Sequence, residues 1–203
     1  MKKIVLSITR DEFKILPEKA KLKLLNKNNN KCTSCSIDID NNIAHYHTEG
    51  KLSYPLCSLC YYPLHLERLT GKDPGKIIMF EELTQVELNS LLRAIYFIKN
   101  YQSENEEAVD AVEIIETVLK ERTEMADVYY ASGVSNIDLI VQKLYGCSEE
   151  DYNKRENGLY ALRWMPNVDN FKKDMDFWAA KSFAKYTPNN WQKLILSVAK
   201  KTN

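Results

Sequence analysis

The sequence contains no apolar run of about 18 residues, so we expect no segment of it to span a membrane. Its opening stretch, MKKIVLSITRDEF, has a basic start, but the apolar part is only about four or five residues long, which is too short for a secretory signal peptide. Internal repeats and low-complexity tracts are also absent. These absences favour an ordinary globular chain, and 203 residues are enough for one sizeable core.

The chain also lacks net charge, because 28 lysines and arginines balance 28 aspartates and glutamates. The balance is uneven, however: residues 1–80 have 13 basic and 8 acidic side chains, residues 81–127 have 4 and 12, and residues 128–203 have 11 and 8. The modest basic excess of the first part is only a weak indication of nucleic-acid binding. The acidic middle predicts a solvated helix face or a docking surface.

The chain lacks the cysteine pattern of a secreted disulfide scaffold, because four of its five cysteines fall in two close pairs, which favours a reducing cytoplasm. The spacing Cys-x2-Cys-x21-Cys-x2-Cys lets two knuckles complete a tetrahedral site for one zinc ion. The predicted ligands are Cys32, Cys35, Cys57 and Cys60. A site with four cysteine ligands is closed, so we expect this zinc to be structural. The fifth, Cys147, is expected to be a lone thiol without a role.

Local patterns predict a mixed first part and a helical second part. Alternation indicates one or two short strands within residues 2–16, and IDIDNNIAHYH indicates a hairpin that turns at Asn41-Asn42. IIMFEEL, which begins at Ile77, is typical of a strand or an extended segment. Helical spacing and start signals predict helices at about residues 17–27, 84–98, 106–130, 136–145, 168–178 and 187–198.

The predicted fold class is therefore α+β. Residues 1–80 form a zinc-stapled module, and residues 81–203 form a mostly α-helical region that packs with it as one unit. The helical region has a clear beginning, because Thr84 and Glu87 have the spacing of a capping box.

Two histidines, His45 and His47, lie between the cysteine pairs and face the same way on the expected hairpin. The simplest interpretation is a partly buried histidine on a sheet face, and the alternative is a catalytic one. The order of helix, cysteine pair, histidine-bearing hairpin, cysteine pair and helix resembles the zinc-bearing HNH (ββα) nucleases. In those enzymes a histidine on the hairpin activates water. The resemblance therefore implies that His45 or His47 occupies this position.

The resemblance to HNH nucleases fails at the positions that bind the catalytic metal. Ala44 and Tyr46 stand where an aspartate or histidine ligand is expected, Leu52 where the family has asparagine, and Tyr61 where it has histidine. His65 lies four residues further along and cannot be assumed to substitute. Because metal-assisted phosphodiester hydrolysis needs that ion, we expect an HNH-like scaffold that is not an enzyme.

A closer resemblance rests on IMFEELTQVELNSLL at residues 78–92 and LRWMPNVDNFKKDMDFWAA at residues 162–180, with the cysteine module before them. From about Leu24 to Ala184, these segments are similar in sequence and order to the IcmJ family, also called DotN, of type IVB (Dot/Icm) secretion systems. The resemblance implies an HNH-like fold with a structural zinc on the four cysteines and without the nuclease residues.

The same resemblance implies a non-catalytic subunit of the type IVB coupling complex. Such a subunit binds the cytoplasmic C-terminal tail of the coupling ATPase, DotL, alongside DotM and the IcmS–IcmW adaptor, and supports the recruitment of effector proteins for export. It is cytoplasmic, peripheral to the inner membrane through the complex, and is not expected to bind nucleic acid. The resemblance assigns no partner-contact residues to this chain.

A helical tail can lie in a groove between amphipathic helices, with aromatic side chains as anchors. The aromatic residues that are candidates for this role, against a default of core packing, are Tyr61, Tyr62, Tyr129, Tyr130, Trp164 and Trp191. Two alternatives stay open from the residues alone. The first is an HNH-type metal-dependent nuclease that uses His45 or His47, and the second is a DNA-binding zinc module that uses the basic first part.

Overall fold

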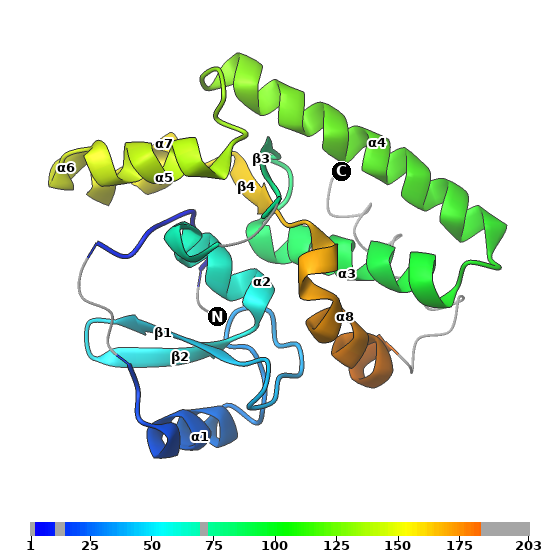
Figure 1. Cartoon of the computed structure of the whole chain (residues 1–203), viewed down its shortest axis with the longest axis horizontal. Coiled ribbons are helices and arrows are strands. Elements are labelled where there is room, and N and C mark those ends of the chain that lie inside the picture. The colour runs from blue at the N-terminus through cyan, green and yellow to red at the C-terminus, as the bar shows by residue number, and fades with distance from the viewer. Residues whose placement is uncertain (1–2, 11–14, 70–72, 184–203) are drawn as a thin grey trace.

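A computed structural model describes residues 3–10, 15–69 and 73–183 of the chain (Figure 1). Helices dominate, and the strands form two small antiparallel sheets, so the fold class is α+β as predicted. The helices are α1 (Glu18–Lys27), α2 (Ser58–Tyr61), α3 (Gln85–Tyr101), α4 (Glu106–Tyr129), α5 (Ile137–Gly146), α6 (Glu149–Asn153), α7 (Arg155–Gly158) and α8 (Lys172–Trp178). The strands are β1 (His45–Glu49), β2 (Leu52–Leu56), β3 (Lys76–Met79) and β4 (Leu162–Met165). None of the helices in the described ranges is long and apolar enough to cross a bilayer.

The first sheet is a hairpin, but it lies further along the chain than predicted. Strand β1 pairs with β2 in antiparallel register, with His47 opposite Tyr54, and the turn falls at Gly50, whose φ of 59° suits glycine. The expected turn at Asn41-Asn42 is wrong as a hairpin turn. The Asp40 side chain accepts hydrogen bonds there from the backbone N–H of Asn42, at 2.8 Å, and of the residue after it. That local turn precedes the strand rather than joining two strands.

The strands predicted within residues 2–16 do not form in the described part of that stretch. Residues 3–10 are extended and bury Leu6 and Ile8, but their backbone meets two 3₁₀ turns, Tyr62–Leu64 and Leu66–Arg68, instead of a strand. The Ser7 N–H donates to a carbonyl in the first turn at 2.8 Å, and the Ser7 carbonyl accepts from the second at 3.0 Å. A 3₁₀ turn offers no continuing row of donors and acceptors, so no ladder develops.

The second sheet joins the two parts of the chain. Strand β3 pairs with β4 so that Ile77 lies opposite Trp164, and both side chains are fully buried. The strand at 162–165 was not predicted. It is only four residues long and directly precedes a helical pattern, so its sequence shows too little alternation to indicate a strand. The stripe that follows is helical as expected, with a 3₁₀ turn at Val168–Phe171 leading into α8. The helix predicted at 187–198 lies outside the described residues.

Helix α3 begins with the predicted capping box. The Thr84 hydroxyl accepts from the Glu87 N–H, and the Glu87 carboxylate accepts from the Thr84 N–H. The inward face of α3 is unusually polar for a core helix, because Gln85, Asn89 and Arg93 are all buried on it. This face covers the cysteine module.

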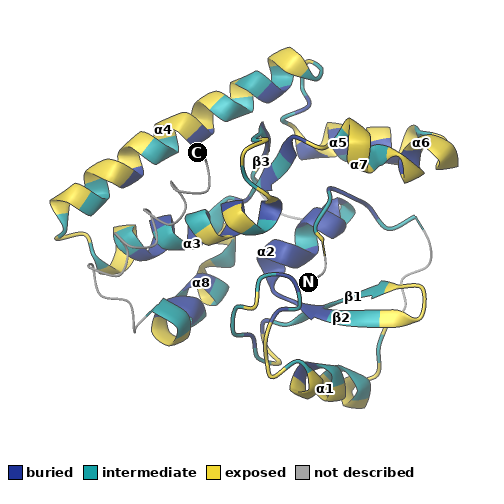
Figure 2. Cartoon of the chain, turned by 180° about the vertical axis from the view of Figure 1, so that it is seen from behind, coloured by how far each residue is buried: buried dark blue, intermediate teal, exposed yellow. Residues whose placement is uncertain are grey.

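Helix α4 is the longest helix and crosses the molecule over β3 (Figures 1 and 2). It buries one narrow stripe, formed by Val112, Leu119 and Ala126, which packs on the second sheet and α3. Along most of its remaining surface α4 is exposed (Figure 2). The chain therefore has a dense core around the cysteines and β4, and a long helix that is covered on one side.

Candidate metal centre and histidine cluster

Two tight turns position the cysteines. The first pair follows α1, where the Cys32 N–H donates to the Ile37 carbonyl at 2.9 Å and the Cys32 carbonyl accepts from Ser36 at 2.9 Å. In the second pair, Cys57 caps the N-terminus of α2, and its carbonyl accepts from the N–H of Cys60 at 3.0 Å. Each cysteine pair is thus folded by its own local hydrogen bonds.

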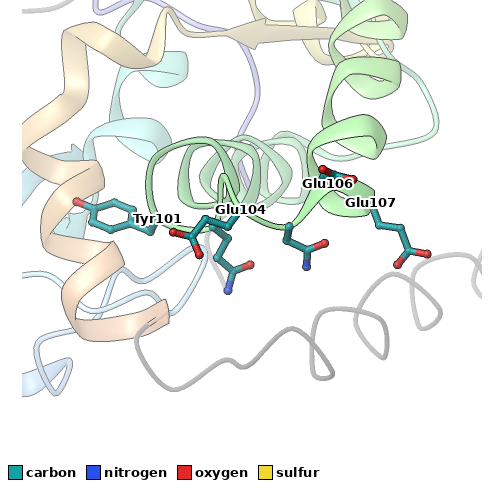
Figure 3. A pocket seen from close by; sticks show the side chains of 6 residues that line it. Tyr101, Glu104, Glu106 and Glu107 are labelled. Carbon is teal, nitrogen blue, oxygen red and sulfur yellow. The ribbon is translucent and has the colours of Figure 1, made fainter.

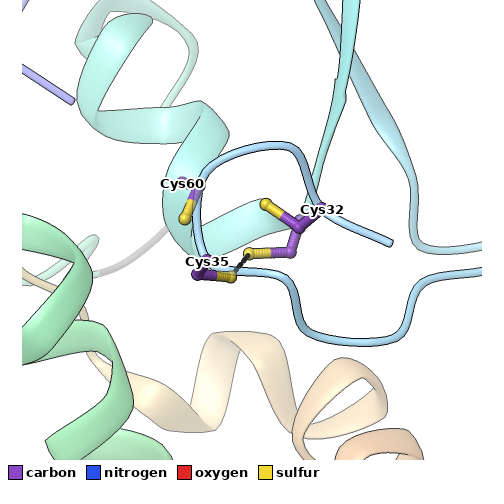
Figure 4. Close-up of side chains that lie close together, drawn as sticks. Cys32, Cys35 and Cys60 are labelled. Carbon is purple, nitrogen blue, oxygen red and sulfur yellow. Dashed lines mark hydrogen bonds between the residues drawn. The ribbon is translucent and has the colours of Figure 1, made fainter. Parts of the chain in front are cut away.

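The turns bring the sulfurs of the four predicted ligands close together (Figure 4). The Sγ atoms of Cys32, Cys35, Cys57 and Cys60 all lie within 4.8 Å of one another. The distance between the sulfurs of Cys35 and Cys57 is 3.7 Å. A tetrahedral ion with metal–sulfur bonds of about 2.3 Å would have sulfurs about 3.8 Å apart, so the cluster has the dimensions of a four-thiolate metal site.

The burial and the pKa shifts of the cysteines are also consistent with a bound metal ion. Three of the four cysteines are buried. A hydrogen bond with the Cys32 thiol lowers the pKa of Cys35 well below its ordinary value, whereas burial raises the pKa of Cys57. Without a metal, the two cysteines therefore differ in their tendency to lose a proton. A bound metal ion would remove this difference, because it holds all four sulfurs as thiolates.

Helix α3 supplies the groups around the sulfurs. Asn89 donates from Nδ2 to the Leu59 carbonyl at 2.8 Å and to the Sγ of Cys60 at 3.6 Å. Arg93 donates from Nη1 to the Sγ of Cys35 at 3.9 Å. Donors of this kind orient and stabilise thiolate ligands. Sequence reasoning missed both residues, although their four-residue spacing placed them on one helix face.

The burial of Arg93 is the strongest indication that the sulfurs are anionic. Its side chain is 4% exposed, and no carboxylate in the described part of the chain pairs with it. Burial works against the charged guanidinium, but its interactions with Cys35, Cys57 and Cys60 raise its pKa above the ordinary value. A buried cation needs a counter-charge, and four thiolates around a divalent ion carry a net charge of about −2.

The histidines form a second cluster, around Tyr61 at the end of α2. The Nδ1 of His47 lies 2.9 Å from the Nε2 of His65. The ring of Tyr61 stacks between His45 and His65, with centroid distances of 4.7 and 4.2 Å. The prediction that His45 and His47 share a face is confirmed, but His65 was set aside at the sequence level. No spacing rule links it to the hairpin, because the chain must turn twice to bring it there.

The other ring nitrogen of His65 faces two polar side chains. Its Nδ1 lies 2.7 Å from the Thr9 hydroxyl and 3.6 Å from a carboxylate oxygen of Glu67. Burial lowers the pKa of His45 to about 4, with the charges of His65 and Arg68 adding to the shift. Within the described ranges, two imidazole nitrogens converge here without a third histidine, cysteine or carboxylate at metal-binding distance.

Other predicted residues lie away from both clusters. The Cys147 thiol donates to the Leu144 carbonyl at 3.4 Å and is remote from the other cysteines. Of the aromatic candidates, Tyr61 and Trp164 are core residues, Tyr62 and Tyr130 are half-buried and Tyr129 is 68% exposed. Trp191 lies outside the described residues.

A hollow of about 630 Å³ lies at the turn between α3 and α4 (Figure 3). Tyr101, Glu104, Glu106 and Glu107 are among the residues that line it. The glutamates spread along the turn instead of converging on a common point (Figure 3). The hollow therefore lacks the arrangement of a ligand or metal site.

No protein-family model matches this chain, and no curated protein matches it in sequence. The assignment to the IcmJ family consequently stays a prediction. What the geometry establishes is a cluster of four cysteines with the dimensions of a metal site, with Asn89 and Arg93 of α3 in contact with its sulfurs.

Proposed function

We propose that this protein is a non-catalytic, zinc-stapled subunit of a type IVB (Dot/Icm) coupling complex. In this role it binds the C-terminal tail of the coupling ATPase and supports the recruitment of effector proteins for export. Its scaffold is of the HNH type, with the hairpin β1–β2 and helix α2 around a structural zinc, and it acts in the cytoplasm beside the inner membrane.

One observation carries the proposal: the three segments on which the resemblance rests meet in space. Gln85 accepts from the Trp164 N–H at 2.8 Å and donates to the Trp164 carbonyl at 2.8 Å and to Asn89 at 2.9 Å. Asn89 in turn contacts Cys60. The motif residues at 78–92 thus link the segment at 162–180 to the cysteine module, which is what a shared fold requires of them.

The proposed metal is zinc. Four thiolates in tetrahedral arrangement suit zinc or iron, and a closed cysteine site of two knuckles is the usual structural zinc site. When bound, zinc supplies cross-linking of the two knuckles and no chemistry on a substrate. Cys32, Cys35, Cys57 and Cys60 would hold it, while Arg93 would offset the net negative charge of the four thiolates around the ion.

The test is binding of the purified chain to the C-terminal tail of its cognate coupling ATPase, with the metal content read on the same sample. We expect a stable one-to-one complex on gel filtration and one zinc per chain. A folded, zinc-loaded protein that does not bind the tail contradicts the adaptor function.

A nuclease is the second candidate, and the 2.9 Å separation of the His47 and His65 nitrogens is the observation that favours it. Two imidazoles at this distance are hydrogen-bonded and can exchange a proton, as acid–base catalysis requires. Plasmid nicking with Mg²⁺ or Mn²⁺ that His47→Ala or His65→Ala abolishes would establish it. We expect no such cleavage, because the asparagine of the nuclease motif is replaced by Leu52, which is 62% exposed at the hairpin turn.

A further inference from the structure

Helix α4 carries a second stripe, apolar except for one glutamate, that the described residues leave largely exposed, with only Met125 half-buried in it. Its members are Ala111, Ile114, Val118, Glu121, Met125 and Val128. Successive members are separated alternately by three and four residues, which is the heptad repeat of a coiled-coil seam. We call these six residues the outer seam.

The outer seam is distinct from the stripe that holds α4 in the fold. Val112 and Leu119 are 2% and 3% exposed, whereas Ile114 is 67% and Val128 is 76% exposed. Val118, one turn after Ile114, is 37% exposed. At 100° per residue the outer seam lies about a third of a turn away from the buried stripe. It runs for roughly 26 Å, or about five helical turns.

The charge of α4 restricts what can cover this seam. Glu106–Tyr129 contains eight carboxylates and two basic side chains. Asp110 and Glu124 are exposed on one border of the seam, and Glu121 stands within it. A nucleic acid, an anionic bilayer and a second copy of the same acidic helix are all disfavoured by like charge.

We infer that the outer seam of α4 docks an amphipathic helix of a protein partner, with apolar heptad positions bordered by lysine or arginine. Ile114, Val118 and Val128 provide the apolar contact, and the carboxylates select the basic border. Glu121 fixes the register, because a lone polar residue in a seam prefers one opposite position, here a basic one. The inference rests on the proposed function where it expects the ATPase tail to supply this helix.

The first test uses a defined probe: a synthetic three-heptad peptide with Ile and Leu at the seam positions and Lys at the bordering positions. The full-length protein should bind it with an affinity that falls as salt rises. A peptide of the same seam with Glu at the borders should bind at least tenfold more weakly. Absence of binding to the lysine peptide, or equal binding of both peptides, overturns the inference.

Variants then place the binding on α4. The double variant Ile114→Glu, Val118→Glu should bind the lysine peptide at least tenfold more weakly. The added negative charge alone would strengthen the binding, so a loss must come from the missing apolar contact. The matched control is Thr117→Glu, which adds charge at an exposed position beside the seam without removing an apolar side chain, and should bind as well as or better than the parent protein. If the control weakens peptide binding equally, or if the double variant does not weaken it, the outer seam is not the docking site. A dimer of the parent protein that the double variant dissociates overturns it in favour of self-association.

The ATPase tail separates this inference from the proposed function. If the tail binds the parent protein and not the double variant, both stand. If it binds both equally, the adaptor function stands and the seam as its docking site is overturned. If the tail binds neither but the lysine peptide requires the seam, the seam stands and the proposed function fails.

Discussion

The cysteine module and helix α4 use polar residues in opposite ways. Around the cysteines, Gln85, Asn89 and Arg93 are buried, and each has contacts with β4, α2 or the sulfurs. Along α4 most of the charged residues are exposed, and apolar side chains such as Ile114 are exposed to solvent as well.

The comparison separates a region whose structure is specified by internal contacts from a surface that is suited to contact with another molecule. Buried polar groups cost free energy unless every one is satisfied, so a network of them specifies a single arrangement. Exposed apolar side chains in a regular row have no such internal partner and instead indicate contact with another molecule. We expect substitutions in the two regions to differ sharply in their effect on stability.

The largest expected effect is at the metal site. Cys57→Ser removes a fully buried ligand, so it should release the metal and lower the free energy of unfolding by several kcal/mol, roughly 3 or more. Metal analysis and thermal unfolding of the same sample check this. The matched control is Cys147→Ser, which lies outside the cluster and should keep the metal. A Cys57→Ser protein with full zinc and unchanged Tm would remove the four-cysteine assignment.

The next effect is at the link between α3 and β4. Gln85→Leu leaves the Trp164 N–H and the Asn89 side chain without their buried partner, at a cost of about 2–4 kcal/mol. Chemical denaturation measures it against Gln142→Leu, an exposed glutamine on α5 that should change stability little. Similar values for the two variants would mean that the network does not stabilise the fold.

A pH effect is expected at His45. Its pKa in the folded protein is about 4, below the ordinary value of 6.5, so the folded state favours the neutral ring. The contribution to stability is complete above about pH 6.5 and is lost as the pH falls toward 4, by at most about 3 kcal/mol.

His45→Gln is the variant that measures this contribution. The stability of the parent protein should fall more steeply than that of the variant between pH 6.5 and 4, and their difference should be constant above pH 7. Protonation of the cysteines occurs in both proteins and cancels in the difference. Parallel pH profiles would show that His45 is not titrating with a lowered pKa.

A smaller effect is expected from the buried guanidinium. Arg93→Met keeps the packing on Trp178 but removes the positive charge beside Cys35, so zinc affinity should fall about 10- to 100-fold. Competition with a chromophoric chelator measures the affinity. Arg122→Met removes a charge on α4 that pairs with Glu82, far from the sulfurs, and should leave the affinity unchanged. If both variants hold zinc like the parent protein, Arg93 does not stabilise the thiolates.

The smallest effect is expected in the outer seam. Ile114→Glu should change the free energy of unfolding by less than about 0.5 kcal/mol, because the side chain is 67% exposed and glutamate is a good helix former. Denaturant unfolding checks this value. A loss above about 1 kcal/mol would place Ile114 in the core of the fold and erase the contrast between the two regions.

Local signals were enough for the cysteine spacing, the Thr84–Glu87 capping box and the long helices, since each depends on residues a few positions apart. The hairpin was misplaced because the sequence contains two turn signals, and Asn41-Asn42 is the more familiar one. It became an Asx turn, while Gly50 made the hairpin.

Long-range contacts account for what the sequence did not predict. Strand β4 exists because β3 pairs with it, and His65 meets His47 only through the turns after α2. An arginine on an amphipathic helix ordinarily indicates the solvent side. Arg93 is buried against the sulfur of Cys35, which is 58 residues away in sequence, and no local pattern reveals that contact.

The indole of Trp178, which stacks on Arg93 and donates to the Asp38 carbonyl, has a consequence for biosynthesis. The two residues of that hydrogen bond are 140 positions apart. At roughly 5–20 residues per second, a ribosome needs about 7–28 seconds to travel from one to the other. Cys60, the last of the four cysteines, is made 22 residues after Asp38, so for most of this interval all four cysteines exist while Trp178 does not. The proposed zinc is therefore expected to enter the nascent chain first and to be enclosed afterwards, so a chain truncated before residue 178 should exchange a bound metal faster than the complete protein.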